Sequence, residues 1–293
     1  MFPKYLRSGL LFFLAAVVST GADAQHSSPT EPTPPADVNQ FVREMVQHEL
    51  DAGNNDHTLW RYRLHKEDEA AAQDRDVIET KEGSLARTLL INGKPLTPEQ
   101  RTKDEERMKK LVDDPNERAK RERRAKQDEQ KAKDLLRSIP DAFIFKYDGM
   151  DGTLTRLAFS PNPHYSPPTR ELMVYHAMTG KLWVDRAASR LAMIEGRLNE
   201  DVKFGWGLLG HLDKGGTFKV VQKNVGDNHW DTVYLDVNMQ GRAIIFKSIN
   251  VKEKQIFTDY QRVPDDTTIA RAYQMFQRHD SSMTANNQGT GSQ

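Results

Sequence analysis

The sequence contains no cysteine. This absence excludes disulfide bonds, thiolate metal sites, thiol nucleophiles and the lipid-modified cysteine of a bacterial lipoprotein. The formal net charge is +0, so no overall field draws the protein toward nucleic acid or an anionic membrane surface. Stability must therefore come from packing, and a charged partner would need a local patch.

Motifs that accompany catalysis are also missing. There is no Gly-x-Ser-x-Gly elbow, no His pair spaced around a Glu for zinc, and no glycine loop followed by the lysine of a phosphate site. The histidines are scattered, and we expect four of them to lie at the surface or on a rim: His164, His176, His211 and His229. The sequence therefore predicts a protein that is not an enzyme, with no catalytic residues, no metal and no cofactor.

Long apolar runs are absent except near the N-terminus. Lys4 and Arg7 precede the apolar run 9–18, and Ala22-Asp23-Ala24 has the small-x-small form of a cleavage site. The run is shorter than the ~20 residues that a membrane span needs. We therefore interpret 1–24 as a secretory signal peptide rather than an anchor, and we predict a periplasmic protein with no transmembrane span after cleavage.

Past the signal, residues 25–36 are rich in Ser, Thr and Pro and predict a disordered leader. Asp37 then has the position of an N-cap, and apolar residues at helical spacing predict an amphipathic helix from Val38 to Leu50. Alternating apolar and polar residues over 58–91 predict a strand meander. One domain over 37–263 is the expected organisation.

Two helices are expected within an insertion at 97–138. Thr97-Pro98-Glu99-Gln100 has the form of a capping box, and Asp114-Pro115 repeats the start signal for a second helix that should end at Ser138, before Pro140. Nearly every position from Arg118 to Lys133 is charged or Ala, with alternating signs. We therefore expect an exposed helical arm whose deletion spares the sheet, and not a nucleic-acid site, because carboxylates lie among the cations and no aromatic residue is interleaved.

The strand pattern resumes at 142–160 and again over 179–263. Its clearest strand is 230–240, where one face is apolar and the other polar, the apolar face consisting of Val233, Leu235, Val237 and Met239. Residues 171–178 fit a short helix or a strand. The segment 264–293 is expected to be a tail with a short helix, 267–277, and a disordered end. The fold class predicted is α+β: a curved, half-barrel-like antiparallel sheet packed on the N-terminal helix.

The least ordinary stretch is 204–210, where large apolar residues alternate with glycines. Its large side chains are Phe204, Trp206, Leu208 and Leu209. They could fold into the core as a bulged hairpin, line an apolar pocket, or form an exposed patch. We take these four as the candidate ligand-binding residues.

Gly-Lys-Leu-Trp-Val-Asp at 180–185, followed by Leu-Ala-Met-Ile-Glu-Gly at 191–196, resembles the LolA and LolB lipoprotein-carrier superfamily. The resemblance covers mainly 179–263 and lies in the arrangement of elements. It implies a half-barrel sheet around helices, an apolar cavity for acyl chains, and residence in the bacterial periplasm. The charged insertion departs from those carriers.

Two hypotheses for the function follow. The first is a periplasmic binding protein whose sheet holds an acyl chain or a lipoprotein. The second is a scaffolding protein of the cell envelope, which docks another envelope protein through the charged arm and holds no ligand. They differ in where the apolar side chains at 204–209 point.

Overall fold

The computed structural model describes residues 34–169, 171–204, 210–243 and 247–278. The predicted signal peptide, most of the leader and the end of the C-terminal tail lie outside these residues.

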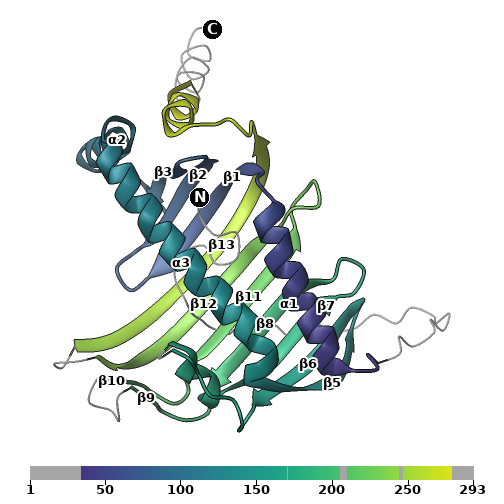
Figure 1. Ribbon diagram of the computed structural model, residues 1–293. Helices are drawn as coiled ribbons and strands as arrows, with labels where there is room; N and C mark the ends of the chain where they lie inside the picture. Colours follow the sequence, from purple (N-terminus) through teal and green to yellow (C-terminus); the bar gives the residue numbers. More distant parts are fainter. Residues whose placement is uncertain (1–33, 170, 205–209, 244–246, 279–293) are drawn as a thin grey trace, which may run out of the picture.

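The chain is an α+β protein built on one large, open antiparallel sheet, as predicted. The sheet has 13 strands, and its main path runs in the order β4-β3-β2-β1-β13-β12-β11-β8-β7-β6-β5. Figure 1 shows this sheet as a single layer. The strands are β1 (Leu59–Asp68), β2 (Ala72–Thr80), β3 (Gly83–Ile91), β4 (Lys94–Pro95), β5 (Phe143–Asp151), β6 (Leu154–Pro161), β7 (Met178–Asp185), β8 (Arg190–Leu198), β9 (Val202–Phe204), β10 (Gly210–Leu212), β11 (Thr217–Asn224), β12 (Trp230–Ala243) and β13 (Lys247–Val263).

The alternation read from the sequence places β12 correctly. Leu235, Val237 and Met239 are buried, while Gln240 is exposed. Val233, predicted on the apolar face, is only half-buried and Thr232 is buried instead, because the pairing with β11 shifts register at this point. Asn92 and Gly93 both have positive φ angles, 52° and 72°, and they turn β3 into β4, as the Asn-Gly pair in the sequence favours. These two features follow from local sequence pattern alone.

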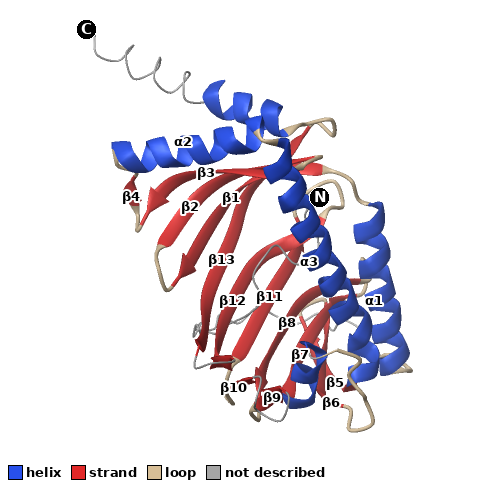
Figure 2. Cartoon of the chain, turned by 60° about the vertical axis from the view of Figure 1, so that its left-hand side comes forward, coloured by secondary structure: helices blue, strands red, loops and turns tan. Residues whose placement is uncertain are grey.

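Helices cross one face of the sheet. Helix α1 (Val38–Asn55) and helix α3 (Pro115–Ala142) contact each other and β5, and Figures 1 and 2 show them side by side. Helix α2 (Pro98–Asp113) lies against β3, and the short 3-10 helix η1 (Glu171–Ala177) settles the ambiguity at 171–178. Among the described residues, no helix combines the length and the apolarity needed to cross a bilayer.

Side-chain caps start the helices where the sequence indicated. The Asp37 carboxylate accepts the amide of Gln40, at 2.9 Å. Thr97 and Gln100 form the reciprocal capping box of α2, and Asp114 caps α3. The predicted end of α3 was wrong, because the helix continues through Pro140 to Ala142. A proline in the last turn removes only one hydrogen bond there and does not stop the helix.

The prediction of an exposed helical arm at 97–138 was also wrong. Met108 and Leu111 of α2 are buried at 3% and 1% exposure, and Ala125 and Ala132 of α3 are buried as well. The helices present a narrow apolar stripe to the sheet and their charged residues to solvent. Small residues such as alanine make that stripe inconspicuous in a sequence dominated by charge.

The described residues form a large core, a smaller one, and a third cluster of Tyr62, Val77 and Phe257. The large core fills the space between the sheet and helices α1, α3 and η1. The smaller core joins α2 to the sheet and to a helical segment at 269–278, which buries Ile269, Ala272 and Phe276. The segment predicted as a tail is therefore, up to residue 278, a packed element.

Candidate functional site

An apolar cavity of about 350 Å³ lies between the helices and the sheet. Its volume falls in the range of ~300–1,000 Å³ that small-molecule sites occupy. The lining residues are Glu49, Ala132, Leu135, Leu136, Ile139, Phe143, Phe145, Phe159, Glu171, Val174, Tyr175, Met178, Leu182, Leu191, Ile194, Leu212, Phe218, Val220, Gln222 and Leu235.

The floor of the cavity is a row of aliphatic side chains across four neighbouring strands. Leu182 of β7 pairs with Ile194 of β8, and Ile194 pairs with Val220 of β11. Val220 in turn pairs with Leu235 of β12. Residues paired directly across a sheet point to the same face, so the register of the strands assembles this row.

Two glycines make room for aromatic rings beside that row. Gly180 and Gly196 are direct partners on β7 and β8. A Cβ at Gly196 would lie 2.5 Å from the ring of Phe218, and a Cβ at Gly180 would lie 2.8 Å from the ring of Phe159. Both rings line the cavity. The two glycine-containing strand sequences thus shape the aromatic part of the floor.

Helix α3 provides the roof. Ala132, Leu135, Leu136 and Ile139 recur at the spacing of one helical face, and all four line the cavity. The hydroxyl of Tyr175 in η1 donates to the carbonyl oxygen of Leu135 at 3.0 Å. Burial raises the pKa of this tyrosine, so the hydroxyl keeps its proton.

A buried ion pair lies at the edge of the cavity, where Glu49 is one of the lining residues. Glu49 of α1 is 1% exposed, and its carboxylate accepts hydrogen bonds from Nε and Nη2 of Arg190 at 2.8 and 3.0 Å. The backbone amide of Leu191 donates to the same carboxylate at 2.8 Å. This bidentate arrangement satisfies a charge that would otherwise be costly to bury.

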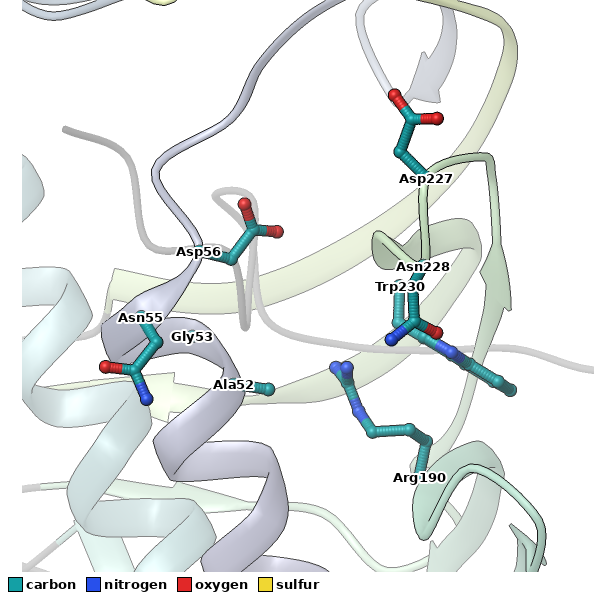
Figure 3. Close-up of a pocket in the computed structure, with 8 residues that line it drawn as sticks. All are labelled: Ala52, Gly53, Asn55, Asp56, Arg190, Asp227, Asn228 and Trp230. Atoms are coloured by element: carbon teal, nitrogen blue, oxygen red, sulfur yellow. The ribbon is translucent and has the colours of Figure 1, made fainter.

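A second, polar pocket of about 290 Å³ lies around Arg190. Figure 3 shows Asp56 on one side of it and Arg190 and Asn228 on the other, with their polar ends toward the space between them. The side chain of Asn55 points away from that space (Figure 3). The guanidinium of Arg190 also lies over the ring of Trp230, 5.6 Å from its centroid.

His229 lies behind this pocket and was wrongly expected at the surface. It is 2% exposed, its Nδ1 is hydrogen-bonded to Asp56, and its Nε2 lies 3.5 Å from Asp231 Oδ2. The Trp60 ring stacks on it with centroids 5.0 Å apart. Burial lowers the pKa of His229, but the carboxylates of Asp231 and Asp56 outweigh burial, and the net direction is upward.

The predicted ligand-binding residues fall largely outside the described part of the chain. Trp206, Leu208 and Leu209 lie outside it, as does the side chain of Phe204. Phe204 ends β9 and pairs through its backbone with Gly210 of β10. Leu212, two residues further along β10, lines the cavity. Strand β10, which follows 205–209, therefore reaches the cavity.

The site defines a class of protein: an α+β chain with an apolar cavity between helices and sheet, beside a polar pocket. Within the described residues, no group of three or more histidine or carboxylate side chains is arranged to hold a metal ion. No family model matches the chain, and comparisons with curated proteins and with solved structures also gave no match.

Proposed function

We propose that this protein binds an apolar ligand, such as an acyl chain or the lipid part of a lipoprotein, and carries out no reaction. The observation that supports the proposal is the cavity of about 350 Å³ with an almost wholly aliphatic and aromatic lining. Burying an alkyl chain there would gain about 0.8 kcal/mol per methylene. In this account the sheet acts as a half-barrel, and α3 is the cover under which the chain lies.

The binding residues proposed are those of the floor and the roof. Leu182, Ile194, Val220 and Leu235 contact one side of the ligand. Ala132, Leu135, Leu136 and Ile139 contact the other. The stretch 204–209 follows β9 and precedes β10, so it remains our candidate for the mouth of the cavity.

The N-terminal sequence supports a location for this activity. Basic residues, the apolar run 9–18 and the Ala22-Asp23-Ala24 site together have the pattern of an export signal. We therefore place the mature protein in the periplasm, where acyl chains and lipoproteins must be shielded from water during transfer between membranes.

The charged face of α3 favours this function over a scaffold that docks through the helix. Lys126 pairs with Glu122 and Lys133 pairs with Glu129, each at 2.7 Å and one turn apart. Charges paired within one helix are partly compensated before any partner arrives, which weakens their attraction for it.

Filling the cavity from the roof tests the proposal. Ala132 is 4% exposed and lines the cavity, so Ala132→Phe should occupy the space that a ligand needs. We expect this variant to bind a fluorescent fatty acid at least tenfold more weakly than the wild type in a fluorescence titration. Its melting temperature should not fall.

Ala119→Phe is the matched control, because Ala119 lies on the same helix with an exposed side chain. It should bind the fatty acid like the wild type. Equal binding by wild type, Ala132→Phe and Ala119→Phe would contradict the proposed site, and no binding by the wild type would contradict the proposed function.

A further inference from the structure

The apolar cavity and the polar pocket share one wall. Glu49 lines the cavity, and Arg190, its partner in the bidentate ion pair, lines the polar pocket. Residues near these two in the chain also divide between the two spaces. Leu191, next to Arg190, lines the cavity, and Ala52, one turn after Glu49 on α1, lines the polar pocket. The ion pair thus marks a boundary between an apolar space and a polar one.

The groups that face the polar pocket include both donors and acceptors. Nε and Nη2 of Arg190 donate to Glu49, and a guanidinium has further N–H donors. Asn228 offers an amide that can donate and accept. The carboxylate of Asp56 already accepts from Thr58 and is hydrogen-bonded to His229, and a carboxylate has about four lone-pair sites with which it can accept further. Figure 3 shows these three side chains around the same opening.

Each charged group around this pocket has a partner. Arg190 is opposed by Glu49, and Asp56 is hydrogen-bonded to His229, which Asp231 also faces. Asp227 lies 3.4 Å from Nη1 of Arg262. An anionic ligand would meet Asp56 and Asp227, and a cationic ligand would meet Arg190. A hydroxyl group both donates and accepts, so neighbouring hydroxyls can satisfy Arg190, Asn228 and Asp56 together without a charge.

We propose that the polar pocket binds a neutral, hydroxyl-bearing head group, a glycerol or a sugar, whose attached chain lies in the apolar cavity. The ligand is then amphipathic, and the Glu49–Arg190 pair lies where its polar and apolar parts meet. This inference rests on the proposed function, because the chain must occupy the cavity for the head group to lie beside Arg190.

Titration calorimetry with probes of equal chain length tests it. The probes are dodecyl maltoside, monododecanoyl glycerol, dodecanoate and dodecyltrimethylammonium, each below its critical micelle concentration. We expect one of the two hydroxyl-bearing probes to bind at least about tenfold more tightly than both charged ones. Tighter binding of dodecyl maltoside would identify the head group as a sugar, and tighter binding of monododecanoyl glycerol would identify it as glycerol.

Asn228→Gly should weaken the binding of the preferred hydroxyl-bearing probe about fivefold, because the side-chain amide that meets its hydroxyls is removed. Glycine keeps the backbone, because Asn228 has a φ of 56° in the left-handed region. Asn92→Gly is the matched control, since Asn92 has a φ of 52° in the β3–β4 turn. It should leave the binding of every probe unchanged.

The outcomes separate the two proposals. Equal affinity for all four probes would overturn the head-group site and leave the acyl-binding function standing. A preference that Asn228→Gly does not alter would also overturn the head-group site. Failure of every dodecyl probe to bind would overturn both.

Discussion

Glu49 shows how a single residue could have indicated the site. It occupies the apolar face of α1 between Val46 and Leu50, where a carboxylate needs a partner. The sequence gives the helical spacing but not that partner, because Arg190 lies 141 residues away. His229 was missed for the same reason: nothing near it in the chain shows that Asp56 and Trp60 enclose it.

His229 should make stability depend on pH. Its pKa in the folded protein is raised above the usual value of about 6.5. Its stabilising contribution is therefore fully present below that value and is lost as the pH rises through the raised pKa. We expect the free energy of unfolding to fall less between about pH 6 and pH 8 in His229→Gln than in the wild type.

Urea denaturation across that range measures the difference. The pKa of His65 is also raised, by Glu67 and Asp74, so some pH dependence should persist in the variant. Parallel stability curves for His229→Gln and wild type would contradict the role assigned to His229.

At the scale of elements, the residues at which helices begin were easier to predict than the surfaces against which the helices pack. The caps at Asp37, Thr97 and Asp114 are local chemistry and were read correctly. The burial of α2 and α3 was not, because a charged helix with a stripe of alanine and leucine looks exposed until a sheet is placed beneath it. Deletion of 97–138, expected to spare the sheet, would instead remove the roof of the cavity.

The helical segment at 269–278 gives a prediction at this scale. Phe276 is 1% exposed, and the guanidinium of Arg87 lies 4.9 Å from its ring centroid. Phe276→Ala should therefore destabilise the protein by about 3–5 kcal/mol, as large-to-small core changes do. Gln274→Ala, an exposed position on the same helix, should change stability by less than about 0.5 kcal/mol. Chemical denaturation of both variants checks this, and equal effects would show that the segment is not part of the core.

For the whole molecule, strand alternation was enough to predict a large antiparallel sheet with helices. The cavity depends on which strands are neighbours and in which register, as in the row from Leu182 to Leu235. A local sequence pattern specifies neither the order of the strands nor their register. The sequence directed attention to apolar residues at 204–209, whereas the described lining comes from residues spread between Glu49 and Leu235.

The central claim is that this cavity holds an alkyl chain. Calorimetric titration of saturated fatty acids from eight to twelve carbons tests it most directly. The account predicts that affinity rises about fourfold per added methylene, the equivalent of ~0.8 kcal/mol, with a negative heat-capacity change. Affinities that do not depend on chain length, or no binding at any length, would contradict it.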